Sequence, residues 1–122
     1  MKHRRRFPSL LLVVVLCLAP VFVCAHSILI ESMPKHGATL KSAPQSLLLR
    51  FNAKIEPALT KVSLVSSRNH RTPLEISGDS TVDRIVARMP PLEPGVYTVV
   101  YKVLATDGHV TQGSIRFTLL AS

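Results

Sequence analysis

The sequence predicts an all-β domain of six or seven short strands, folded as a β-sandwich or a small Greek-key barrel. Three observations lead to this prediction. Nine prolines and five glycines interrupt the chain at short intervals. Several segments between them alternate apolar and polar residues, as half-buried strands do. No segment repeats its apolar residues with a convincing helical period, so the sandwich and barrel classes are favoured.

The first 25 residues are predicted to be a cleaved secretory signal peptide. Basic residues gather at positions 2–6, and an almost unbroken apolar run follows at 9–23. That run is shorter than the ~20 residues of a membrane-spanning helix. Val23 and Ala25 stand at the small-residue positions that a signal peptidase reads. Cleavage after Ala25 would leave one exported domain, residues 26–122.

Removal of this leader changes the charge and the cysteine content. The whole chain has a formal charge of +8, but four of its 15 Lys and Arg lie in the leader. The mature domain would keep 11 basic against seven acidic residues and no tryptophan, which gives little support for nucleic-acid binding. Both cysteines, Cys17 and Cys24, also lie in the leader. The mature domain must therefore be stabilised by its core rather than by disulfides.

Most segments of the mature chain are predicted strands separated by proline- and glycine-rich connections. Residues 34–44 are expected to form a loop, and residues 67–72 a polar turn. Val62 and Leu64 fall on one face of their segment, as alternation requires. The strands expected before the last hairpin are residues 27–32, 47–51, 61–66, a short edge strand at 74–76, and 82–89.

The strongest strand signal is a hairpin at the end of the chain. Residues 96–106 are rich in valine and tyrosine, and in residues 111–120 the apolar Ile115, Phe117 and Leu119 alternate with polar residues. Asp107, Gly108 and His109 lie between the two strands.

Asp107 and His109 are candidate metal ligands. Positions two apart on an extended chain point to the same side, so a carboxylate and an imidazole can converge on one ion. Asp-Gly is also a favoured hairpin turn in its own right. From Asp107, Gly108 and His109 alone, the turn is the better interpretation.

His26 favours the metal site, because cleavage after Ala25 would make it the N-terminal residue. Its α-amine and imidazole could then close a chelate ring on one metal. With His109 and Asp107 they form a nitrogen-dominated set that suits Cu(II). The ligands must lose protons to bind, so binding is expected to weaken below about pH 6 to 7. The competing interpretation is that a histidine follows the cleavage site by accident.

Three stretches resemble the CopC/PcoC (YobA-like) family of periplasmic copper-resistance proteins. Residues 26–40 match its opening, a histidine and a short strand before a Pro-x-x-Gly-Ala-x-Leu loop. Residues 45–51 resemble its second strand, and residues 92–119 its closing hairpin with Asp-Gly-His. The resemblance implies a seven-stranded Greek-key β-barrel, cupredoxin-like or immunoglobulin-like. It also implies one bound Cu(II), held by His26, Asp107 and His109, and a CopD-like membrane partner.

The other soft or basic ligands fit this site less well. Some family members carry a methionine-rich Cu(I) site, for which thioethers are the natural ligands. The mature chain has only Met33 and Met89, far apart in sequence, so Cu(II) alone is predicted. His36 is a candidate accessory ligand, but a solvated loop residue is the better interpretation. His70, between two arginines, is expected in a charged turn.

Three functions remain open from the sequence. The first is a monomeric, non-enzymatic Cu(II)-binding protein of the periplasm that sequesters copper or delivers it to a membrane transporter. The second is a copper-dependent redox enzyme of the histidine-brace type, which the low aromatic content and the third ligand Asp107 disfavour. The third is a metal-free β-sandwich module, in which Asp107 and Gly108 form only a turn.

Overall fold

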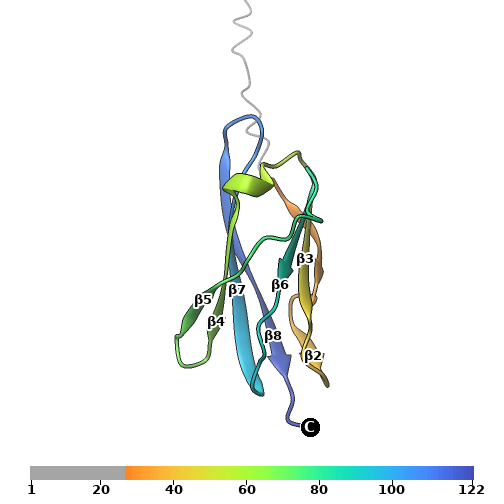
Figure 1. Cartoon of the computed structure of the whole chain (residues 1–122), viewed down its shortest axis with the longest axis vertical. Helices are drawn as coiled ribbons and strands as arrows, with labels where there is room; N and C mark the ends of the chain where they lie inside the picture. The colour runs from red at the N-terminus through yellow and green to blue at the C-terminus, as the bar shows by residue number, and fades with distance from the viewer. Residues whose placement is uncertain (1–26) are drawn as a thin grey trace, which may run out of the picture.

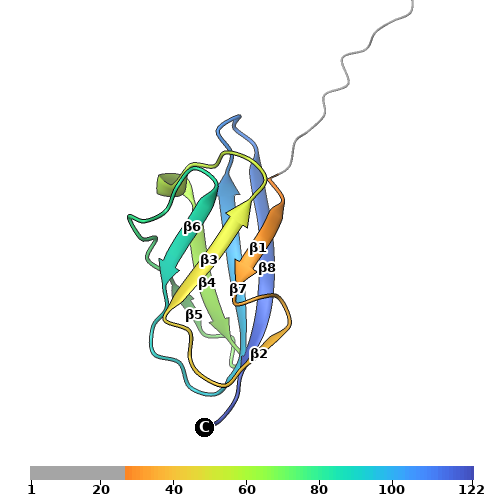
Figure 2. The same cartoon turned by 90° about the vertical axis from the view of Figure 1, so that its right-hand side faces the viewer.

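Residues 27–122 are described by a computed structural model, and they form two β-sheets packed face to face (Figures 1 and 2). The three-stranded sheet has the order β1 (Leu29–Met33), β3 (Ser46–Phe51), β6 (Arg84–Arg88). The five-stranded sheet has the order β2 (Ala38–Leu40), β8 (Val110–Leu119), β7 (Gly95–Leu104), β4 (Lys61–Ser66), β5 (Arg71–Pro73). The predicted all-β class is confirmed, and the arrangement is a sandwich of two sheets.

Apolar residues alternate along the strands and form the core between the sheets. In β7, Tyr97, Val99, Tyr101 and Val103 are buried, and every second residue faces outward. Two aromatic contacts line the core, one between the two sheets and one between neighbouring strands of the five-stranded sheet. Phe51 of β3 meets Tyr101 edge-on with ring centroids 5.6 Å apart, and Tyr97 stacks on Phe117 at 5.5 Å.

Residues 27–122 form eight strands rather than the seven that the resemblance implied. The predicted loop at 34–44 contains β2, which pairs in parallel with the last residues of β8. The predicted edge strand at 74–76 lies earlier, in β5, and Ile76 makes only an isolated bridge to Ala87. Both corrections concern three-residue strands, whose pairing depends on neighbours distant in sequence and not on their own alternation.

The chain crosses between the sheets at most of its connections, and only β4–β5 and β7–β8 are hairpins within one sheet. The β7–β8 turn, the start of β1 and the 3₁₀ turn η1 (Pro57–Leu59) lie at one end of the sandwich (Figures 1 and 2). The predicted signal peptide and His26 lie outside the described residues. Within residues 27–122, no helix is long and apolar enough to cross a membrane.

Candidate metal centre

The β7–β8 connection folds as a tight turn around Gly108. The Gly108 N–H donates to the Ala105 carbonyl at 2.9 Å, and the Ala105 N–H donates to the His109 carbonyl at 2.8 Å. Gly108 has φ +92°, in the left-handed region that favours glycine. The predicted turn is therefore present, and residues 107–109 are not extended as the metal-site hypothesis assumed.

This turn nevertheless brings the Asp107 and His109 side chains together. Asp107 Oδ1 accepts the His109 backbone N–H at 3.0 Å, and Asp107 Oδ2 lies 3.0 Å from His109 Nδ1. Two ligand atoms at right angles, each ~2.0–2.1 Å from one metal ion, would stand about 2.9 Å apart. The Oδ2–Nδ1 separation is also that of a hydrogen bond, so an ion bound by both atoms would replace the proton that they share in the metal-free protein.

The pair is accessible, and its carboxylate is in the ionised form that a metal needs. About half of each side chain is exposed, 47% for His109 and 48% for Asp107. Hydrogen bonding from the His109 side chain, and then from its backbone N–H, lowers the pKa of Asp107 below its usual value. Asp107 is therefore a carboxylate at neutral pH.

The start of the described chain lies at the same end of the sandwich as this pair. Ser27 is buried, and the Ile28 N–H donates to Asn52 Oδ1 at 2.7 Å. The Asn52 backbone N–H donates in return to the Ile28 carbonyl at 3.0 Å. The sequence did not point to Asn52, because its partner Ile28 lies 24 residues away. The one local signal is the position of Asn52 directly after a predicted strand.

The segment after Asn52 also holds the β7–β8 turn. The Thr106 N–H donates to the Lys54 carbonyl at 3.0 Å, the Glu56 N–H donates to the Leu104 carbonyl at 2.8 Å, and Ile55 bridges Ala105. Only one residue separates Asn52 from Lys54, a Cα–Cα span of less than about 8 Å. The turn with Asp107 and His109 and the start of β1 are thus both hydrogen-bonded to the short segment 52–56.

His36 lies away from the pair. Its Nδ1 accepts the Arg116 backbone N–H at 3.1 Å, beside the point where β2 begins to pair with β8. Arg116 is seven residues beyond His109, which at ~3.3 Å per strand residue places His36 roughly 20 Å from the pair. The structure therefore does not bring His36 to the candidate site.

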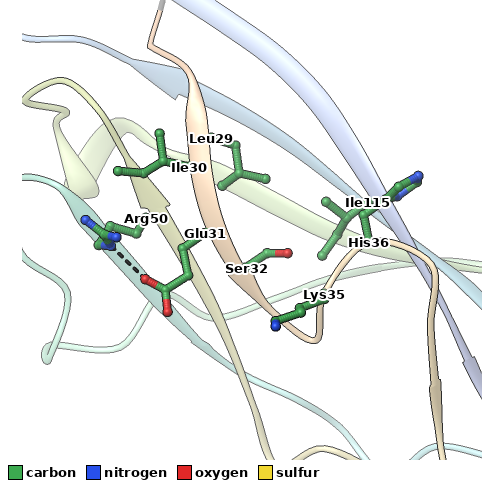
Figure 3. Close-up of a pocket in the computed structure, with 8 residues that line it drawn as sticks. All are labelled: Leu29, Ile30, Glu31, Ser32, Lys35, His36, Arg50 and Ile115. Carbon is green, nitrogen blue, oxygen red and sulfur yellow. Dashed lines mark hydrogen bonds and ion pairs between the residues drawn. The ribbon is translucent and has the colours of Figure 1, made fainter.

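His36 lines a surface depression of about 520 Å³ around edge strand β1. Figure 3 shows the residues that line this depression. Ser32 and Ile115 line its inner side, while Glu31 and Arg50 form an ion pair of 2.8 Å on the outer face. Among the residues that line this depression, His36 and Glu31 are the candidate metal ligands, and Glu31 is already paired with Arg50. It offers no alternative metal centre.

The methionines do not form a joint site either. Met89 is in the core, whereas Met33 is half exposed on edge strand β1. Within residues 27–122, no three His, Cys, Asp or Glu side chains gather around one point. Two predicted ligands, Asp107 and His109, are therefore together in the described part, and the third, His26, precedes it by one residue.

Two sequence relatives align with most of this chain. Protein YobA of Escherichia coli (strain K12) is 29% identical over 100 residues, which cover 80% of this chain and 81% of YobA. The copper transport protein CutJ of Bacillus subtilis is 29% identical over 122 residues, or 98% of this chain. These residues are only 22% of CutJ, so this chain corresponds to about a fifth of that protein.

Solved structures share the fold. CopC from Methylosinus trichosporium OB3b matches with a TM-score of 0.71 and 28% identity, over 78% of this chain and 94% of that one. PcoC, a methionine-rich copper resistance protein from E. coli, matches with a TM-score of 0.63 and 23% identity, over 78% and 99%. The CopC domain model matches residues 29–120. The chain therefore belongs to the CopC domain family.

Proposed function

We propose that the mature protein binds one Cu(II) ion through the amine and imidazole of His26, the His109 imidazole and the Asp107 carboxylate. The observation that carries this proposal is the Asp107–His109 pair, 3.0 Å between Oδ2 and Nδ1, at the end of the sandwich where the chain enters β1. Copper in the names of CutJ and PcoC supports the choice of metal.

The donor set favours the oxidised ion. Nitrogen and carboxylate ligands in a tetragonal arrangement suit Cu(II), whereas Cu(I) prefers thioethers and thiolates. Met33 and Met89 differ in exposure and form no thioether cluster, in contrast to the methionine-rich PcoC. We therefore expect no separate Cu(I) site.

The ion is cargo in this proposal, and no reaction is required. We infer that the protein is exported to the periplasm after cleavage at Ala25 and acts as a monomer. There it would sequester copper or deliver it to a CopD-like membrane protein. The alignment with about a fifth of CutJ supports a role in copper delivery, since a domain of this kind occurs there within a longer copper transport protein.

The proposal is tested by titrating Cu(II) into the chain that begins at His26. His26→Ala and His109→Ala should each weaken binding by more than roughly 10- to 100-fold, because even groups that only orient a metal ligand account for that much. Acetylation of the His26 α-amine should weaken binding as well, since it removes the chelating amine but keeps the imidazole. His36→Ala is the matched control and should bind as the wild type does.

Other outcomes would favour the alternative functions. Equal binding by the wild type and His26→Ala would contradict the chelate, and no binding at all would favour a metal-free module. Peroxide production by the copper-loaded protein with ascorbate, well above that of free copper, would favour a redox enzyme. N-terminal sequencing of the exported protein shows independently whether His26 has a free amine.

A further inference from the structure

We propose that Asn52 is a positioning residue for the copper site, which fixes the start of the mature chain relative to the Asp107–His109 turn. This inference rests on the proposed function, because it assigns to Asn52 the role of orienting His26, the proposed ligand two positions before Ile28. Asn52 itself is not proposed to touch the metal.

The start of β1 needs such an anchor because its ladder is irregular. Leu29 pairs with Phe51 and Glu31 with Arg50, so Ile30 is an extra residue, a β-bulge. β1 is also an edge strand and has β3 as its neighbour in the sheet. Beyond the bulge, the pairing of Leu29 and the two bonds between Ile28 and Asn52 hold the first residues.

The Asn52 side chain supplies a bond that the backbone does not. The Ile28 N–H is bound by Oδ1 at 2.7 Å, while the Asn52 backbone N–H binds the Ile28 carbonyl. A side chain without an acceptor at position 52 would lose the first bond and keep the second. The anchor can therefore be weakened selectively while the rest of the strand pairing remains.

The same segment carries the anchor to the metal-binding turn. Lys54 and Ile55 contact Thr106 and Ala105, directly before Asp107. Ser27, next to the anchored residue, is buried, so the chain is held in place from its first described residue. Ordering a loose terminus on metal binding costs conformational entropy, and an anchor that has already ordered it lowers this cost.

The experiment compares Asn52→Leu, which has similar size and no acceptor, with Asn52→Asp, which keeps an acceptor. Ser66→Ala is the matched control, because Ser66 Oγ accepts the His70 N–H in the same way at 3.2 Å. Ser66 pairs with Tyr97, at the opposite end of β7 from the metal turn. Amide hydrogen exchange of the metal-free chains, Cu(II) affinity and the Cu(II) EPR spectrum are measured for each.

We expect Asn52→Leu to lose protection at the Ile28 amide, to bind Cu(II) roughly three- to tenfold more weakly, as loss of one net hydrogen bond implies, and to give a heterogeneous EPR spectrum. Asn52→Asp should retain protection, affinity and a single EPR species. Ser66→Ala should lose protection only at His70.

The inference is overturned if Asn52→Leu exposes the Ile28 amide but leaves affinity and spectrum unchanged, or if that amide is unprotected in the wild type. Both results would leave the proposed function intact. Failure of the wild type to bind Cu(II) would instead remove the proposed function together with the role of Asn52. Circular dichroism distinguishes these outcomes from a variant that does not fold, in which case Asn52→Asp still tests the anchor.

Discussion

Gly108 shows how a single residue builds the candidate site. Its φ of +92° closes the turn that lets Asp107 Oδ1 accept the His109 N–H. No atom would obstruct a Cβ at this position, so the demand for glycine there comes from the backbone angle alone. The same pair of residues on an extended strand would not make this backbone contact.

We therefore predict that Gly108→Ala destabilises the domain by about 1–2 kcal/mol, the cost of a left-handed backbone for a residue with a Cβ. Gly78→Ala is the control, because Gly78 also has open space around it but has no left-handed backbone angle. Urea denaturation measures both. Equal effects of the two substitutions would show that the backbone angle of Gly108 is not responsible.

We expect Asp107 to strengthen Cu(II) binding both through its negative charge and through the carboxylate oxygen that it offers as a ligand. Asp107→Asn keeps the size and one acceptor of the side chain but removes the negative charge. We predict weaker Cu(II) binding with little change in the free energy of unfolding, since the side chain is half exposed. Calorimetric titration beside urea denaturation checks this, and an unchanged copper affinity would exclude Asp107 as a ligand.

Among the strands, β7 and β8 form the longest hairpin, and one contact within it is unusually tight. Gly113 lies opposite Tyr101, and a Cβ built on Gly113 would overlap the Tyr101 ring and hydroxyl. Tyr101 also packs against Phe51 of the other sheet, so the ring has little freedom to move away. The absence of a side chain at position 113 thus leaves room for the Tyr101 ring to lie over the neighbouring strand.

Gly113→Ala is predicted to destabilise the domain by about 1–3 kcal/mol, as overpacking of a core does. In a Tyr101→Leu background the same substitution should cost much less, because the overlapping ring is gone. A double-mutant cycle by urea denaturation measures this coupling. Strict additivity of the two substitutions would contradict the proposed overlap.

The sequence predicted the long strands well and the short ones poorly. Burial of Ile115, Phe117 and Leu119 follows directly from their alternation, which is a local property. β2 and β5 have three residues each, too few for alternation to show, and their pairing depends on β8 and β4. The Asp107–His109 pair was predictable because its residues are neighbours, whereas the Asn52 anchor links segments 24 residues apart.

Across the whole molecule, burial of the Tyr101 side chain is expected to make the free energy of unfolding depend on pH in the alkaline range. Burial raises the pKa of Tyr101 above its ordinary value of 10.0, because the phenolate would be poorly solvated. The unfolded chain then loses this proton at lower pH than the folded one. The contribution of Tyr101 to the free energy of unfolding is fully present below about pH 10. It decreases as the pH rises toward the folded-state pKa.

We predict that the unfolding free energy decreases from about pH 10 upward, and that Tyr101→Phe removes part of this decrease. Urea denaturation at several alkaline pH values, with tyrosinate absorbance of the folded protein, provides the measurement. Identical alkaline profiles for the wild type and Tyr101→Phe would contradict the assignment.

The direction of β8 has a practical consequence. It begins beside His109 and runs ten residues toward the last residue, Ser122, at the other end of the sandwich (Figure 1). Ten strand residues span about 33 Å. A tether joined after Ser122 would fix the domain to an electrode or bead with the Asp107–His109 end turned toward the solution, an orientation suited to an immobilised sensor.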